Sequence, residues 1–567
     1  MGFLHFSGQA LSYRIFVNPK APQASTHLPM DTAGQNPYLG RSLMQSCRHA
    51  LFRSETILIP ANFHTRPAGY ATALHSAVFG PAVFGLAVFG LAVFANATMA
   101  AEQASHPALA MSTCELALPG TPLTMAAECG WFEVAENPAE PNGRHIKLRV
   151  ARVPAQERRV EPDPVLFLAG GPGQAASEAW LIVASGFTKL NKNRDILLID
   201  QRGTGQSNPL RCPQAELAEA LATDWDQLAG TTRQCLQSLD ADPRFYTTTI
   251  AMQDYDLVRA ALGYEQLNLL GISYGTRAAQ VYLKLFPQRV RTLVLDGVAP
   301  QTLALGSEHA EKLDLALQRI LASCKADPPC NQAFPELAQN LNDMIKQLEI
   351  SPVEVTVDNP LTGQPFTFTF DREALASSIR FLTYSAETQA MLPLLIHEAA
   401  TQGNYQRIAS QLLITASGLS ESIAQGMEMS VVCAEDFPLF PEPAADSQRL
   451  LGDSMIRAAA IECAVWPRGE VPADFHAPVV SAVPALLLSG ELDPVTPPEY
   501  AEQVKAGLSN SLHLVAPGQG HSISGRGCVG HMVTDFIVAA SLDGLDTKCL
   551  AQLQASPWFM SLTGPNP

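Results

Sequence analysis

Near the middle of the chain stands Leu267-Asn268-Leu269-Leu270-Gly271-Ile272-Ser273-Tyr274-Gly275, where a short apolar run turns into Gly-x-Ser-x-Gly. The apolar run is typical of a buried strand, and a helical pattern follows from Arg277 to Phe286. A serine between such a strand and such a helix sits on a tight turn, where flanking glycines relieve the crowding. The stretch therefore predicts that Ser273 is a nucleophile. A structural serine in an ordinary tight turn is the alternative.

Short apolar runs of the same kind recur on both sides of this stretch, with helical patterns between several of them. Such runs fill a parallel sheet that is buried on both faces. Strands that alternate with helices indicate an α/β fold with a mostly parallel sheet. An alternating segment at 144–153 precedes these runs and is typical of a half-buried strand. The runs are Val165-Leu166-Phe167-Leu168, Ile196-Leu197-Leu198-Ile199, Leu293-Val294-Leu295 and Ala485-Leu486-Leu487-Leu488.

The regular spacing of these runs stops at Asp296, and the next one begins only at Ala485. A gap of roughly 185 residues is far longer than any connecting loop. Its composition is largely helical, with a candidate hairpin at 353–357 and 366–370. We expect a large, mainly helical cap domain inserted into the α/β core, and an independent second domain is the alternative. The expected boundaries are 101–297 and 484–567 for the core and 298–483 for the cap.

A serine hydroxyl is a weak nucleophile and needs a base, together with a group that orients that base. Asp493 stands in the turn after a buried run, and His521 ends a Gly-rich loop after the following strand. The order serine, acid, histidine along the chain is that of α/β hydrolases. We therefore predict a catalytic triad of Ser273, His521 and Asp493.

Other residues compete for two of these roles. Glu491 is the rival acid, but Asp493 sits deeper in the turn, just before Pro494. His513 alternates within its strand, which favours a packed core residue, and His531 is expected on a helix.

A glycine turn upstream of the nucleophile, Ala169-Gly170-Gly171-Pro172-Gly173, follows another core strand. Bare backbone N–H groups in such a turn can approach the negative charge that develops on a carbonyl oxygen. We expect the N–H groups of Gly171 and Tyr274 to form the oxyanion hole, and an ordinary Gly-Pro turn is the alternative. The segment 200–207 is expected to be a structural turn with a buried ion pair that braces the site.

Charge and motifs exclude several functional classes. The formal net charge is -17, and no run of Lys and Arg is interleaved with aromatic residues, so nucleic acid is not an expected partner. No P-loop, HExxH or CxxC pattern is present, and no metal or organic cofactor is implied.

The N-terminal part of the chain has the features of a targeting segment. Residues 77–95 are apolar and uncharged, and small residues follow at 95–101, like a signal-peptidase site. We expect residues 1–100 to be a leader with an export signal; a retained anchor and a buried core segment are the alternatives. Export would place the protein in the periplasm or outside the cell, without stable membrane association once the leader is removed.

Ten cysteines remain after the leader, and an even count fits an oxidising compartment. Disulfides between sequential neighbours are the preferred hypothesis, and unpaired buried thiols are the alternative. The cysteines are Cys114, Cys129, Cys212, Cys235, Cys324, Cys330, Cys433, Cys463, Cys528 and Cys549.

Taken together, the motifs resemble those of the exported proline iminopeptidase and tripeptidyl aminopeptidase branch of the α/β hydrolases, over most of the chain after residue 110. Cys433-Ala434-Glu435-Asp436 and Cys463-Ala464-Val465-Trp466-Pro467 are similar to segments of its tripeptidyl aminopeptidase-like members. The other matching motifs are Gly170-Gly171-Pro172-Gly173, Asp200-Gln201-Arg202-Gly203-Thr204-Gly205-Gln206-Ser207, Gly271-Ile272-Ser273-Tyr274-Gly275-Thr276, Gly490-Glu491-Leu492-Asp493-Pro494-Val495-Thr496-Pro497 and Gly518-Gln519-Gly520-His521.

The resemblance implies a serine aminopeptidase that releases proline or short di- and tripeptides from short peptides with a free N-terminus. It also implies that cap carboxylates hold the free amine, and Glu435 and Asp436 are the candidates; surface charges beside a disulfide are the alternative. Ala169 stands where proline iminopeptidases usually carry histidine, which puts a strict preference for proline in doubt. A carboxylesterase on the same core and a non-catalytic binding protein on a hydrolase scaffold are the other candidate functions.

Overall fold

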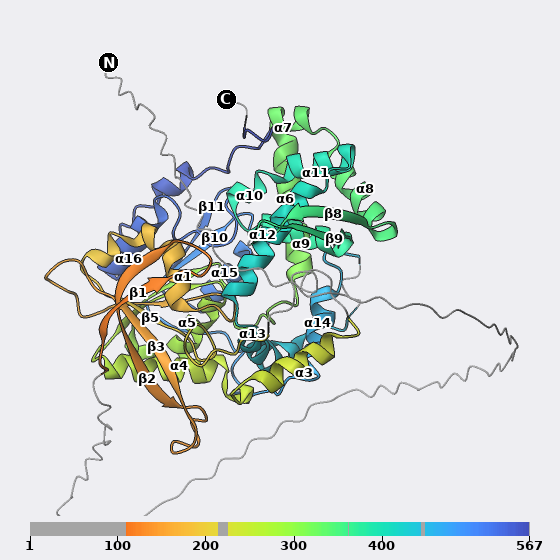
Figure 1. Ribbon diagram of the computed structural model, residues 1–567. Coiled ribbons are helices and arrows are strands. Elements are labelled where there is room, and N and C mark those ends of the chain that lie inside the picture. The colour runs from red at the N-terminus through yellow and green to blue at the C-terminus, as the bar shows by residue number, and fades with distance from the viewer. Residues whose placement is uncertain (1–108, 214–224, 361, 444–447, 566–567) are drawn as a thin grey trace, which may run out of the picture. The chain divides into compact units, whose positions relative to one another are not determined.

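The computed structural model in Figure 1 describes residues 109–213, 225–360, 362–443 and 448–565. The leader expected for residues 1–100 lies outside these ranges. Within them, none of the helices combines the length and the apolar character that crossing a membrane requires.

A nine-stranded sheet, in the order β1-β2-β3-β5-β4-β6-β7-β10-β11, organises the core. The pairings from β1 to β5 are antiparallel, and all those from β5 to β11 are parallel. Strands β4, β5 and β10 are buried along their whole length, as expected for a sheet covered on both faces. The strands are β1 (Ser112–Ala117), β2 (Thr124–Ala135), β3 (His145–Val153), β4 (Val165–Leu168), β5 (Ile196–Ile199), β6 (Leu267–Ile272), β7 (Val290–Asp296), β10 (Ala485–Gly490) and β11 (Ser511–Ala516).

Helices pack on both faces of this sheet. On one face, Trp180 of α1 (Ala176–Val183) and Phe536 of α16 (Val529–Ala539) share an apolar cluster with β4 and β5. On the other face, α4 (Thr248–Ala261), α5 (Tyr274–Leu285) and α15 (Pro498–Lys505) share an apolar cluster with β6, β7 and β10. The predicted α/β architecture, a mostly parallel sheet between two layers of helices, is confirmed.

A long, mainly helical segment separates β7 from β10, as the gap in the sequence predicts. It has an apolar cluster of its own around Leu375, Phe370 and Leu348, and in Figure 1 several of its helices, α8, α9, α11 and α12 among them, group around the hairpin of β8 (Val353–Asp358) and β9 (Pro365–Phe370), while α13 and α14 lie beside α3 (Leu228–Ser238). We call this segment the insertion. Its helices are α6 (His309–Ala326), α7 (Pro328–Ala333), α8 (Leu337–Ile350), α9 (Arg372–Leu382), α10 (Ala386–Gln389), α11 (Leu392–Gln402), α12 (Gln406–Ser422), α13 (Gln425–Val431) and α14 (Ser454–Cys463).

Five disulfides join cysteines that are neighbours along the chain. Two of them, Cys212–Cys235 and Cys433–Cys463, meet in one small cluster with Trp466, so that α3 (Leu228–Ser238) and α14 are tied down close together. The other three pairs are Cys114–Cys129, Cys324–Cys330 and Cys528–Cys549.

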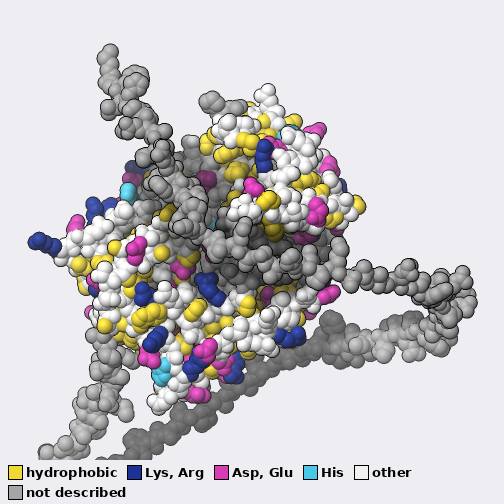
Figure 2. Space-filling model, in the orientation of Figure 1, with side chains coloured by type: hydrophobic (Ala, Val, Ile, Leu, Met, Phe, Trp, Pro, Cys, Tyr) yellow, Lys and Arg dark blue, Asp and Glu magenta, His cyan; other side chains and the backbone are white. Residues whose placement is uncertain are grey.

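The surface drawn in Figure 2 mixes both signs of charge. Dark blue Lys and Arg side chains and magenta Asp and Glu side chains are interspersed on this face, and the residues drawn in colour form no basic stripe. A stripe of that kind is the footprint of a nucleic-acid-binding surface.

Candidate active site

Ser273 occupies the turn between β6 and α5. Its backbone has φ 57° and ψ -124°, in a region that residues other than glycine rarely adopt. Neighbouring glycines permit this turn: a Cβ on Gly271 would lie 2.4 Å from the carbonyl oxygen of Gly275, and one on Gly275 would lie 2.1 Å from that of Leu168. The local sequence thus holds Ser273 at the carboxyl end of the central strands.

Asp493 and His521 form a close pair in the loops after β10 and β11. The Nδ1 atom of His521 lies 2.7 Å from Oδ2 of Asp493, and the N–H groups of Val495 and Thr496 each donate to Oδ1 at 2.8 Å. Burial by itself raises the pKa of Asp493, but the opposite effect of His521 and these donors is larger. The pKa therefore lies below its ordinary value, and the carboxylate stays ionised. An ionised acid here orients the imidazole and leaves Nε2 as the base.

The same environment sets the protonation of the imidazole. Burial lowers the pKa of His521, but the attraction of Asp493 outweighs it, so the pKa lies above the ordinary value. The backbone N–H of His521 donates to the carbonyl of Tyr384 at 2.8 Å, and the two rings meet edge to face at 5.4 Å. Since Tyr384 belongs to the insertion, this segment contacts the catalytic candidates directly.

The end of β7 connects Ser273 with the His521 loop. The carbonyl of Asp296 accepts the N–H of Ser273 at 2.9 Å, and its buried carboxylate accepts the N–H groups of Ile523 and Ser524 at 2.9 and 2.7 Å. The next residue is Gly297, where a Cβ would lie 2.9 Å from Cε1 of His521. The structure therefore brings Ser273, His521 and Asp493 to one place.

Asp296 and Thr496 are candidates that the sequence analysis did not single out. Thr496 donates its hydroxyl to Oδ2 of Asp493 at 2.8 Å and lies 3.1 Å from Nδ1 of His521. Asp296 has a visible signal, because it ends the apolar run beside the nucleophile strand. Thr496 has none, since threonine is common in turns.

The rivals for the acid and the base have other contacts. Glu491 accepts the N–H of Gly518 at 2.9 Å, which braces the loop before His521. His513 lies between Glu502 and Ser489, at 2.6 and 3.0 Å, within β11. His531 lies on α16.

The glycine turn after β4 packs against the nucleophile. A Cβ on Gly170 would lie 3.2 Å from Cβ of Ser273, and Gly171 and Gly173 have φ values of 104° and 109°, which suit glycine. The turn that carries Gly171 and the helix N-terminus that carries Tyr274 therefore flank Ser273 on two sides.

The turn at 200–207 packs beside the nucleophile turn and is held by buried charged residues. Arg202 is buried and pairs with Asp254 at 2.7 Å, while the carboxylate of Asp200 accepts the N–H of Ser177 at 2.9 Å. Gln201 donates to the hydroxyl of Tyr274 at 3.0 Å, so this turn contacts the residue after the nucleophile.

Glu435 and Asp436 lie inside the protein, with relative exposures of 1% and 0%. Burial, and then the like charge of Asp436, raises the pKa of Glu435 to about 8. Asp436 pairs with the buried Arg277 at 2.6 Å. The alternative that they are surface charges beside a disulfide is wrong.

Two other carboxylates of the insertion, Glu428 and Glu462, interact electrostatically with each other. Burial raises the pKa of Glu428 against the opposing charge of Arg380, and the same Arg380 interacts electrostatically with His521. Burial, together with the like charge of Glu428, raises the pKa of Glu462 to about 7. Glu428 nevertheless keeps solvent access.

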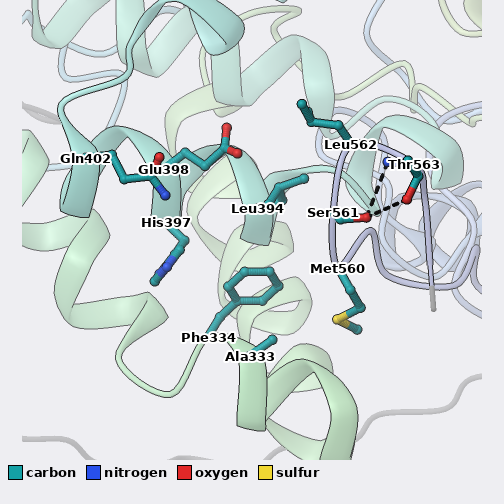
Figure 3. A pocket seen from close by; sticks show the side chains of 10 residues that line it. All are labelled: Ala333, Phe334, Leu394, His397, Glu398, Gln402, Met560, Ser561, Leu562 and Thr563. Atoms are coloured by element: carbon teal, nitrogen blue, oxygen red, sulfur yellow. Dashed lines mark hydrogen bonds between the residues drawn. The ribbon is translucent and has the colours of Figure 1, made fainter.

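A pocket of about 630 Å³ lies elsewhere, between α7, α11 and the C-terminal residues 560–563. Figure 3 shows His397 and Phe334 in its wall, and Glu398 in the same wall pairs with Arg407. None of its lining residues belongs to the triad, so it is separate from the candidate active site.

Comparison with known proteins agrees with this arrangement. Residues 163–525 match the family model of the alpha/beta hydrolase fold. The serine protease Hip1 of Mycobacterium tuberculosis is 25% identical over 494 residues, which cover 80% of this chain and 93% of that protein. A tripeptidyl aminopeptidase of Streptomyces coelicolor is 24% identical, over 76% of this chain and 84% of its own. A carboxylesterase B of Mycobacterium tuberculosis is 26% identical, over 78% and 90%.

Proposed function

The chain belongs to the alpha/beta hydrolase fold family, and on that premise we propose that it is a serine peptidase with Ser273, His521 and Asp493 as its triad. One observation carries the proposal. Asp493 and His521 are paired at 2.7 Å, and the end of β7 is in contact both with the His521 ring and with the nucleophile turn. An imidazole oriented in this way next to a strained serine turn has the arrangement that acyl transfer needs.

In the proposed mechanism, Nε2 of His521 takes the proton of Ser273 as its Oγ attacks the carbonyl carbon of the substrate. The N–H groups of Gly171 and Tyr274 stabilise the oxyanion of the tetrahedral intermediate. His521 then gives the proton to the leaving amine, which departs and leaves an acyl-enzyme. Water, activated by the same histidine, hydrolyses the ester and restores Ser273.

The substrates of the proposed enzyme are short peptides with a free N-terminus, from which it releases proline or short di- and tripeptides. The tripeptidyl aminopeptidase among the relatives supports this class of substrate. We assign the free amine to Glu428 and Glu462 instead of Glu435 and Asp436, since the latter pair is buried and occupied by other partners. Because Ala169 replaces the histidine usual in proline iminopeptidases, we do not restrict the residue at the cleaved bond to proline.

The insertion is the natural cap of such a site. We assign 298–483 to the cap and 101–297 with 484–567 to the hydrolase core. Tyr384 of the insertion contacts His521, so the cap would limit how much of a peptide can reach Ser273. The five disulfides favour an oxidising compartment, in keeping with export to the periplasm or the medium.

A carboxylesterase is the second candidate, and the similarity to a carboxylesterase B of Mycobacterium tuberculosis favours it. The triad and the oxyanion hole act on amides and esters alike, so the core does not distinguish the two. The difference would come from the carboxylates at Glu428 and Glu462, which an ester without an amine does not need.

Purified mature protein and its Ser273→Ala variant should be assayed on aminoacyl, prolyl and tripeptidyl amides, their N-acetylated forms, and short-chain esters. The proposal expects turnover of the free-amine peptides, and no turnover by the variant. Esters turned over in place of all amides would favour the carboxylesterase. Absence of turnover together with peptide binding would favour a non-catalytic binding protein.

A further inference from the structure

Glu435 and Asp436 are consecutive residues of the insertion that contact two different parts of the nucleophile region. They end one turn of π-helix, Val432–Asp436. Turns of this type widen the helix locally and are frequent at functional sites. The disulfide at Cys433 anchors this turn to the end of α14.

Glu435 reaches the nucleophile turn through two hydroxyls. Thr248 donates its N–H to Oε1 of Glu435 at 2.6 Å and its hydroxyl to Oε2 at 2.8 Å. The hydroxyls of Thr248 and Tyr274 lie 2.7 Å apart, and Gln201 donates to Tyr274 at 3.0 Å. Hydrogen bonds that run in one direction strengthen each other in a buried site. This series of hydrogen bonds links Glu435 to Tyr274, whose backbone N–H is the proposed oxyanion donor.

Asp436 contacts α5 three residues after Tyr274, at Arg277. It pairs with Arg277 of α5 at 2.6 Å, and neither side chain has any exposure to solvent. Arg277 also donates to the backbone carbonyls of Pro300 and Leu303, while Leu305 donates its N–H to Asp436 at 2.9 Å. The first turn of α5 is therefore held to the beginning and to the middle of the insertion at once.

Both carboxyl groups are engaged by other residues of the protein, although Oδ2 of Asp436 has no hydrogen-bond partner among the described residues. Both oxygens of Glu435 accept hydrogen bonds from Thr248, and Asp436 is compensated by a buried guanidinium. Burial, followed by the charge of Asp436, raises the pKa of Glu435 to about 8. A carboxyl group that is enclosed and hydrogen-bonded at both oxygens suits a positioning role better than capture of a cation.

We infer that Glu435 and Asp436 are positioning residues that hold the first turn of α5, and with it the Ser273 hydroxyl and the Tyr274 N–H, in the geometry of acyl transfer. An oxyanion donor acts only within a few tenths of an ångström of its ideal place, so small shifts of this turn slow the chemical step. The inference rests on the proposed serine hydrolase function and gives these two carboxyl groups a role in that step.

The test measures the rate at which a fluorophosphonate labels the full-length mature protein. In that reaction the Ser273 oxygen bonds to phosphorus as fluoride leaves and His521 takes the proton, so no peptide specificity is involved. Glu435→Ala and Tyr274→Phe should each lower the labelling rate about tenfold or more. The same factor should appear in kcat, with KM little changed, for free-amine and N-blocked substrates alike.

Two further variants separate positioning from general stability. Glu435→Gln keeps an acceptor for Thr248 and should stay within about threefold of the parent rate. Asp163→Asn breaks a buried pair with Arg194 (3.0 Å) at the opposite end of β4; it should lower Tm and leave the labelling rate unchanged. Tyr274→Phe removes only a hydroxyl, so it keeps the test open if Glu435→Ala does not fold.

Labelling of Glu435→Ala and Tyr274→Phe at the parent rate would overturn the inference. So would a loss in Glu435→Gln that appears only with free-amine substrates, because it would return Glu435 to amine binding. A parent protein that the probe does not label would overturn the proposed function itself, and this inference with it.

Discussion

The hydroxyl of Thr496 donates a hydrogen bond to the Oδ2 atom of Asp493 over 2.8 Å. The same oxygen faces Nδ1 of His521 at 2.7 Å, so one contact from the β10–α15 loop sets the direction of the carboxylate. Both oxygens of the acid are thereby held, because two backbone N–H groups donate to the other oxygen, Oδ1.

Replacement of this hydroxyl should slow the chemical step. Thr496→Val keeps the shape of the side chain and removes one hydrogen bond to a charged acceptor, which is worth about 1.5–3 kcal/mol, or a factor of roughly 10–100 in kcat. Thr496→Ser retains the donor and serves as the control. Equal kcat values for the two variants, measured on the best peptide substrate, would show that the hydroxyl does not position Asp493.

The dependence of activity on pH should follow His521. Burial lowers its pKa, but Asp493 raises it more, and only the neutral imidazole accepts the serine proton. We therefore expect kcat/KM to fall as the pH drops through a pKa above the ordinary value of about 6.5. Asp493→Asn should move this acid limb to lower pH and reduce kcat by about 10⁴. An acid limb that stays in place in Asp493→Asn would contradict the pairing.

Binding of free-amine substrates should depend on Glu462. Burial and the charge of Glu428 raise the pKa of Glu462 to about 7, so its carboxylate loses charge below that pH, while a peptide amine loses its proton above about 8. The KM for free-amine peptides should therefore be lowest between these values.

Glu462→Gln should raise that KM about tenfold or more and leave N-acetylated substrates unaffected. Glu349→Gln, an exposed change on α8, is the matched control. An equal rise in KM for acetylated peptides would argue against amine recognition.

The carboxylate of Asp296 should matter for stability as well as for catalysis. Asp296→Asn turns an NH₂ group toward one of the N–H donors of Ile523 and Ser524, a buried mismatch that costs about 1–3 kcal/mol of unfolding free energy. Asp535→Asn, which loses only an exposed pair with Lys189, should cost less than about 1 kcal/mol. Denaturant unfolding of the two variants checks the difference; similar losses would contradict the assignment.

The cysteines provide a test of the covalent structure. Mature protein that is unfolded without reductant should contain no reactive thiol, and reduction should release ten. Reduction should also lower Tm, because each closed loop restricts the unfolded chain. Ten reactive thiols before reduction would contradict both the disulfides and the oxidising compartment.

Local patterns were sufficient for the fold and for the candidate triad. Short apolar runs in the sequence indicate buried strands, and the functional side chains of this fold stand directly after such runs. Ser273, Asp493 and His521 each follow one, so their places along the chain already indicate that they meet at one edge of the sheet. The inserted helical segment is visible for a similar reason, because a gap of that length has to fold by itself.

Contacts across the chain had to come from the tertiary structure. Glu435 lies 187 positions from Thr248 in the sequence, and Asp436 lies 159 from Arg277, yet these pairs are hydrogen-bonded and buried. An adjacent Glu-Asp pair looks like a solvated or ligand-binding pair in sequence alone, since burial depends on what packs against it. The sequence by itself therefore determined the α/β architecture and the order of the candidate catalytic residues, which depend on local periodicity. Only the tertiary structure decided that Glu435 and Asp436 are buried and which residues they pair with, because long-range packing determines solvation and partners.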